Sequence, residues 1–111
     1  MNKETEQKIE QLHLFEQNLQ SISVQKQNFQ TQLIEVENAL EELSKSKDKV
    51  YRIVGSIMVL SEKKDVERYL NSKKEIFDLR IKNLEKQENK FKEKVNEVQQ
   101  EVLKELKNKE G

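Results

Sequence analysis

Apolar residues in the first half of the chain recur at alternating spacings of three and four, the spacing of the buried seam in a coiled coil. Two series of positions carry this pattern, and nine of their ten members are apolar. The first series is Leu12, Leu19, Lys26, Leu33 and Leu40, and the second is Phe15, Ile22, Phe29, Val36 and Leu43. A pattern sustained over this many heptads predicts one long helix over residues 5–46.

The pattern stops in the polar segment Ser44–Lys49, and a run rich in β-branched residues follows from Val50 to Leu60. Gly55 and Ser56 lie in the middle of that run. Because glycine tolerates the positive φ that a tight turn requires, the run predicts a β-hairpin over residues 50–60.

A second helix is predicted over residues 62–107, with Ser61 as its N-cap. Its seam series are Leu70, Phe77, Leu84, Phe91 and Val98, and Lys74, Ile81, Glu88, Val95 and Val102. In an antiparallel pair, a register in which facing residue numbers add up to 110 places Leu19 opposite Phe91 and the fold-back at Gly55. A register shifted by one heptad stays open. The sequence therefore predicts a mainly α chain, a single domain over 1–111, in which a short central β-hairpin joins a long antiparallel two-helix coiled coil.

Composition supports this architecture, because only 33% of the residues are hydrophobic and 38% are charged. So few apolar residues do not fill a globular core, but a coiled coil needs only two apolar positions in seven. The 21 basic and 21 acidic residues cancel, which argues against a nucleic-acid partner and a polybasic membrane anchor. The longest apolar run, Ile57 to Leu60, is far too short to span a bilayer, and the charged N-terminus does not resemble a signal peptide. We therefore expect a soluble, cytoplasmic protein.

Residues that could carry chemistry are few. His13 is the only histidine, no cysteine is present, and no metal-ligand spacing or phosphate-binding glycine loop accompanies them. We interpret His13 as a solvated helix residue and expect no catalytic residue, no metal and no cofactor, so the chain is not predicted to be an enzyme. Lys26 and Glu88 interrupt the apolar seams; they either pair across the helices and fix the register or extend outward independently.

Apolar residues outside the seam gather near the two chain ends. Leu14, Leu103 and Leu106 lie off the seam, where the coiled coil itself does not bury them. Together with neighbouring seam residues they form a candidate surface for apolar chains, although a frayed closing turn explains the pattern equally well. The residues of this tip cluster are Ile9, Leu12, Leu14, Phe15, Val98, Val102, Leu103 and Leu106.

A second off-seam group, toward the hairpin, is Ile34, Val66, Tyr69 and Ile76. Together with the apolar residues of the hairpin, this group offers more apolar surface than one hairpin can cover with itself, and the strand edges of the hairpin are unpaired in a single chain. We therefore expect oligomerisation through the hairpin, with a hairpin folded onto its own helices as the alternative. The candidate residues are Val50, Tyr51, Ile53, Val54, Gly55, Ile57, Met58, Val59 and Leu60.

The order helix, hairpin, helix at these lengths resembles the prefoldin family, and specifically its β-type subunit of archaeal kind. Several segments are similar to that family: Ile22–Gln27, Ala39–Ser44, Val50–Arg52, Val54-Gly55, Ile57–Val59, Leu79-Arg80 and Glu85–Glu88. The resemblance covers nearly the whole chain and includes the interruption between the helices.

The resemblance implies an ATP-independent holding chaperone, a hexamer of two α-type and four β-type prefoldin subunits. It also implies that the hairpins assemble into a platform, and that the coiled-coil tips hold unfolded client proteins and deliver them to a group II chaperonin. The alternative is a structural or adaptor coiled coil that binds one folded partner.

Overall fold

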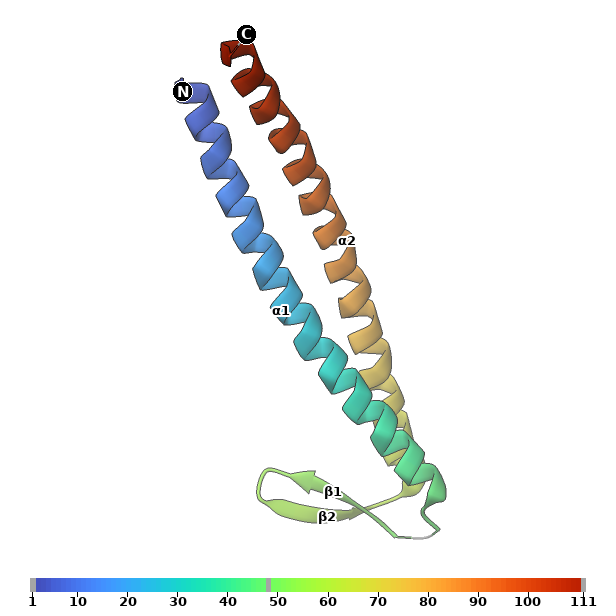
Figure 1. Ribbon diagram of the computed structural model, residues 1–111. Helices are drawn as coiled ribbons and strands as arrows, with labels where there is room; N and C mark the ends of the chain where they lie inside the picture. Colours follow the sequence, from blue (N-terminus) through green and yellow to red (C-terminus); the bar gives the residue numbers. More distant parts are fainter. Residues whose placement is uncertain (1, 48, 111) are drawn as a thin grey trace. The chain divides into compact units, whose positions relative to one another are not determined.

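The computed structural model describes residues 2–47 and 49–110, and Met1, Asp48 and Gly111 of the predicted domain lie outside this description. The elements follow in the order α1 (Lys3–Lys45), β1 (Val50–Val54), β2 (Ile57–Ser61) and α2 (Lys63–Glu110), as Figure 1 shows. The mainly α architecture with a short antiparallel hairpin between two long helices is therefore confirmed. Helix α1 begins before the predicted residue 5, and α2 continues beyond the predicted residue 107.

The chain packs as two compact units, and each helix contributes to both. The terminal unit contains Met1–Lys26 and Asn83–Gly111, and the hairpin unit contains Gln27–Lys82. Within each unit the two helices lie side by side and run in opposite directions (Figure 1).

The core of each unit is the apolar seam between its helices. Among the described residues, six of the seven buried apolar side chains occupy seam positions of the heptad pattern, which shows that the pattern itself defines the core. They are Ile22, Leu84 and Val102 in the terminal unit and Val36, Leu43 and Ile81 in the hairpin unit.

Val66 is the exception, and it corrects one expectation. The sequence places it in an off-seam group, yet its side chain is buried. Val66 lines a surface hollow together with Leu43, Val50 and Tyr51, because the start of β1 passes over the first turn of α2. The other three members of the group, Ile34, Tyr69 and Ile76, are exposed as expected.

The register between the helices follows from contacts in the terminal unit. The rings of Phe15 and Phe91 lie 5.9 Å apart between centroids, and Lys26 Nζ lies 3.4 Å from Glu88 Oε1. The residue numbers of the first pair add up to 106 and those of the second to 114. Only a register centred on 110 brings both pairs within about one helical turn of direct opposition. The predicted register is confirmed, and a shift by one heptad is excluded.

The hairpin unit agrees with this register. The rings of Phe29 and Phe77 lie 6.0 Å apart between centroids. At the junction with the hairpin, Lys63 Nζ donates a hydrogen bond of 3.0 Å to the Ser46 carbonyl. A cation beside the C-terminal end of α1 is favourable, because the free carbonyls there carry partial negative charge.

Helix α2 does not begin with the predicted cap. Ser61 ends strand β2, and its hydroxyl donates to the carbonyl of Val59 rather than capping α2. The carbonyl of Glu62 accepts the amides of Asp65 and Val66, so the first turn of α2 starts from Glu62. The prediction failed because Ser61 pairs with Val50 across the hairpin, which holds it in an extended conformation.

The hairpin turn consists of Gly55 and Ser56, since Val54 pairs with Ile57. Gly55 has a φ of 61°, and Ser56 has no positive φ, which is the φ pattern of a type II′ turn. A Cβ atom added at Gly55 meets no other atom within 4 Å, so the backbone conformation alone demands glycine here.

Replacing Gly55 with valine should loosen the hairpin and leave the helices unchanged. A β-branched side chain at this φ costs about 1–2 kcal/mol, so amide hydrogen exchange over residues 50–61 should become faster. The matched control is Ser56→Thr, because Ser56 has no positive φ, so a β-branched side chain is tolerated there and should accelerate exchange less. Equal exchange rates in the parent and the valine variant would contradict this assignment of the turn.

Lys26 and Glu88 pair across the seam, which resolves the two open interpretations in favour of the ion pair. Their side chains are 23% and 16% exposed, so the pair is partly shielded from water. A double-mutant cycle with Lys26→Met and Glu88→Gln should give a coupling free energy of unfolding of about 0.5–1 kcal/mol. Lys92 also contacts Glu88, at 3.6 Å, so Lys92→Met serves as the control and should couple more weakly because its side chain is mostly exposed. A coupling near zero for Lys26 would mean that the two charges act independently.

Candidate interaction surfaces

The two faces of the hairpin differ in composition. In an antiparallel pair, directly opposed residues lie on the same face of the sheet. The outer face therefore holds Tyr51, Ile53, Met58 and Leu60, and the inner face holds Val50, Arg52, Val54, Ile57 and Val59. The outer face is wholly apolar or aromatic, and all four of its side chains are exposed.

Arg52 identifies which face is turned toward the helices. Its guanidinium carbon lies 4.3 Å from the ring centroid of Tyr69 on α2. Exposure is uneven along the hairpin: Ile53 on the outer face is 77% exposed, whereas Val59, which pairs with Arg52 on the inner face, is 41% exposed. Toward the turn the outer face, with Ile53 and Met58, is open to solvent, and at the base Tyr51 lines the hollow beside Val66.

All nine predicted hairpin residues lie on β1, β2 or their turn. From Tyr51 to Leu60 every residue is exposed, and only Val50, at the base, is half-buried. The hairpin is therefore not folded down onto its own helices.

The tip cluster divides into three groups. Leu14, Leu103 and Leu106 are 38–59% exposed, as their off-seam positions predict. Val102 is buried in the seam. The remaining four residues are half-buried: Ile9, Leu12, Phe15 and Val98. Among the eight candidates, the three leucines are the ones whose side chains present the most apolar surface to solvent.

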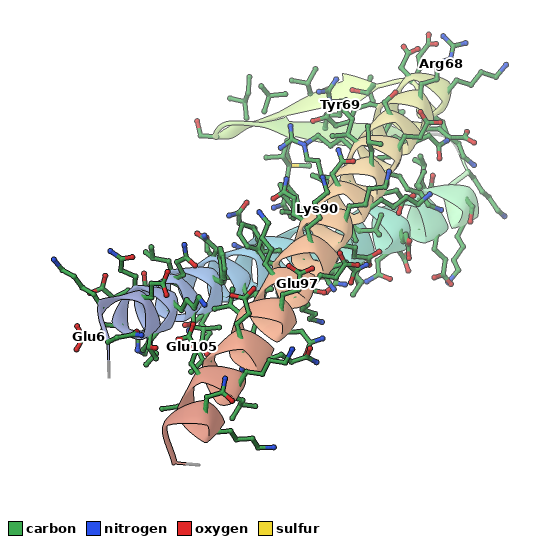
Figure 2. All side chains as sticks on the ribbon, turned by 90° about the horizontal axis from the view of Figure 1, so that it is seen from above. Glu6, Arg68, Tyr69, Lys90, Glu97 and Glu105 are labelled. Carbon is green, nitrogen blue, oxygen red and sulfur yellow. The ribbon has the colours of Figure 1, made fainter. Side chains whose placement is uncertain are left out.

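A polar layer closes the seam beyond the tip cluster. Thr5 is 1% exposed, and its hydroxyl donates to Glu105, while Lys8 Nζ lies 2.6 Å from Glu105 Oε1 and 3.4 Å from Glu101. Figure 2 shows Glu105 on α2 beside the first turns of α1. The hydrogen bond to Glu105, with a further contribution from Glu101, raises the pKa of the Lys8 ammonium, so Lys8 stays charged at neutral pH.

The first turn of α1 is capped within the same layer. Asn2 Oδ1 accepts a hydrogen bond of 2.9 Å from the backbone amide of Thr5 and lies 2.8 Å from the Thr5 hydroxyl oxygen, whose single proton is donated to Glu105. The residues of this polar layer were not among those predicted from the sequence. Extending the heptad series by seven residues, to Thr5, Lys8 and Glu105, would have found it.

Three further exposed residues, Val24, Leu79 and Arg52, were not among the surface residues predicted from the sequence. Val24 and Leu79 are exposed aliphatic side chains on α1 and α2. Arg52 and Tyr69 form the contact between β1 and α2. Side chains alternate along β1, so Arg52 lies on the other face of the hairpin from Tyr51 and Ile53. No sequence signal identifies Tyr69 as the partner of Arg52.

Enclosed sites for small molecules are not evident among the described residues. The hollows there are open depressions, such as one of about 320 Å³ between α1, β1 and α2 in the hairpin unit. Within residues 2–47 and 49–110, no group of three or more histidine, aspartate or glutamate side chains is placed to hold a metal ion. Neither described helix is long and apolar enough to cross a membrane.

Comparison with known proteins identifies the family. The prefoldin subunit model matches residues 6–109. The chain is 40% identical over 96 residues to prefoldin subunit beta of Archaeoglobus fulgidus, covering 85% of this chain and 83% of the relative. It is 31% identical over 96 residues to prefoldin subunit beta of Caldivirga maquilingensis, covering 85% of this chain and 79% of that relative.

A solved structure agrees. The prefoldin beta subunit from Thermococcus strain KS-1 superposes with a TM-score of 0.89 at 32% identity, covering 95% of this chain and 94% of that chain. The beta2 subunit from the same strain shares the fold, with a TM-score of 0.70 at 20% identity, covering 78% of this chain and 95% of that chain. Prefoldin subunits are components of a chaperone and not a family of enzymes. The chain therefore belongs to the prefoldin subunit family, and within it to the beta type.

Proposed function

We propose that this chain is a subunit of an ATP-independent holding chaperone that keeps unfolded proteins from aggregating and delivers them to a group II chaperonin. It assembles with α-type prefoldin subunits and further β subunits into a hexamer of two α and four β, and it works in the cytoplasm. The observation that carries the proposal is the presence of two separate exposed apolar surfaces on a chain whose core is only a seam. One is the hairpin and the other is the tip cluster.

The hairpin is suited to assembly. Its two strands pair only with each other, so each leaves an edge with unpaired backbone groups, and its outer face offers four exposed apolar or aromatic side chains. Strand edges pair readily with strands of other chains, and a two-stranded hairpin is only marginally stable alone. Pairing with neighbouring hairpins would satisfy the edges and bury the outer face together.

The tip cluster is suited to holding clients. Leu14, Leu103 and Leu106 project from helices whose backbone groups are already hydrogen-bonded, so the contact they offer is apolar and non-directional. Such contacts accept many sequences and are individually weak. Several tips joined to one platform raise the effective concentration, so that total binding is strong while each contact remains reversible.

A structural or adaptor coiled coil that binds one folded partner is the alternative. It predicts a homodimer and no suppression of aggregation. The exposed hairpin disfavours this alternative, because a simple adaptor has no need for a second apolar surface with open strand edges.

Charging the outer face should prevent assembly. Mixed with an α-type prefoldin subunit, the parent chain should give a particle of hexamer mass in native mass spectrometry. Ile53→Lys with Met58→Lys should reduce the hexamer at least about tenfold, because buried lysines without partners are costly. The control is Ile34→Lys, which charges an exposed aliphatic residue on α1 and should leave assembly intact. A parent chain that never assembles with an α-type subunit would refute the proposed function.

Removing the exposed leucines of the tip should weaken holding without affecting assembly. The triple variant Leu14→Ser, Leu103→Ser, Leu106→Ser should suppress the aggregation of a chemically unfolded protein several-fold less than the parent, measured by light scattering without nucleotide. The control variant is Leu79→Ser, which removes a comparably exposed leucine of the hairpin unit. Truncating residues 1–15 and 98–111 should have the same effect as the triple variant. If both the triple variant and the truncated chain hold unfolded protein as well as the parent does, the tip cluster is not the client-binding surface.

A further inference from the structure

The hairpin has few side-chain contacts with the helices. Every residue from Tyr51 to Leu60 is exposed. Within the described part of the chain, the stack of Arg52 on Tyr69 is the only hydrogen bond, ion pair or ring contact that joins a strand side chain to a helix. An element that is otherwise held only at its base is free to change its angle. The orientation of the hairpin therefore depends on this contact.

The contact has the geometry of a cation–π stack. The Arg52 guanidinium carbon lies 4.3 Å from the Tyr69 ring centroid, well within the range in which such stacks are attractive. A guanidinium is planar and weakly hydrated, so it lies on a ring face more readily than an ammonium does. Figure 2 shows Tyr69 on the part of α2 that lies next to the hairpin.

Lys73, which lies on α2, contacts the same Tyr69 ring. It follows Tyr69 by one turn of α2, and its Nζ lies 4.9 Å from the same ring centroid. The hydrogen bond from Lys73 lowers the pKa of the Tyr69 phenol, and the charges of Lys73 and Arg52 act in the same direction. Lys73 and Tyr69 both belong to α2, so Lys73 restrains the Tyr69 ring whether or not Arg52 is stacked on it. The ring is therefore already oriented when Arg52 binds to it.

We propose that Arg52 is a positioning residue that fixes the hairpin against α2 by stacking on Tyr69 and so aims the outer face at the neighbouring subunit. Side chains alternate along a strand, so an Arg52 held on α2 turns Ile53, nearer the hairpin turn, to the opposite face. This inference rests on the proposed role of the hairpin in assembly. It adds that assembly requires a set angle of the hairpin as well as an apolar surface.

The angle can be measured directly on the chain. Spin labels at Ser56→Cys in the turn and Asn71→Cys on α2 report the spread of distances between hairpin and helix. The parent should give a narrow distribution, and Arg52→Gln and Tyr69→Leu should each give a broader one. Tyr69→Phe keeps the ring and should stay narrow. Arg68→Leu removes an exposed arginine that neighbours Tyr69 in sequence and should also stay narrow. A distribution in Arg52→Gln as narrow as in the parent would overturn the proposal.

Assembly provides the second readout. Losing an exposed cation–π stack should raise the concentration for half-maximal hexamer formation with the α-type subunit about two- to fivefold. The helix melting temperature should not change, which separates positioning from a general loss of stability. Arg52→Lys keeps the charge but loses the planar stack and should fall between the parent and Arg52→Gln. If Ile53→Lys blocks assembly while Arg52→Gln assembles as the parent does, the positioning role fails and the proposed function stands. If neither change affects the hexamer, the assembly role of the hairpin fails as well.

Discussion

The structure depends on burying a narrow apolar seam between two helices that are otherwise polar. Within residues 2–47 and 49–110, six of the seven buried apolar residues lie on that seam, so little of the core lies elsewhere. Apolar residues off the seam have nowhere to be buried within one chain unless another element covers them, as β1 covers Val66. The exposed hairpin and the exposed tip leucines are thus consequences of one constraint.

A seam made only of similar aliphatic residues would allow several registers, and specific layers restrict the choice. Each unit contains one phenylalanine pair with a cation of α2 above it: Lys94 beside Phe15 and Phe91, and Arg80 beside Phe29. The phenylalanines recur fourteen residues apart on both helices. That repeat alone would tolerate a shift of two heptads. The Lys26–Glu88 pair and the polar layer at Thr5 have no such repeat, so they remove the ambiguity.

The heptad pattern predicted the helices, and the Gly55-Ser56 pair within a β-branched run predicted the turn, because these features depend on local spacing or on one backbone conformation. The register was predicted with a shift of one heptad left open, and the contacts between the helices decide it. The misses have a common physical origin in contacts between elements. Ser61 was predicted to cap the second helix, but it pairs with Val50 across the hairpin. Val66 was predicted to lie off the seam and exposed, but the start of β1 lies beside it. The tip cluster was predicted as one surface, but the seam buries Val102 and leaves the leucines outside. The alternation of side chains along the strands predicts which residues share a face of the hairpin. It does not predict which of the two faces carries the contact with α2.

The two exposed surfaces differ in the physics of recognition. A strand edge offers unpaired donors and acceptors in a fixed order, so its partner must match in direction and register. A leucine on a helix offers only apolar area, since the helix backbone is already satisfied, and it makes no demand on the partner's sequence. The first kind of surface suits a permanent and specific assembly, and the second suits brief contact with many unfolded chains. Placing them in separate units of the same chain lets each be optimised without compromising the other.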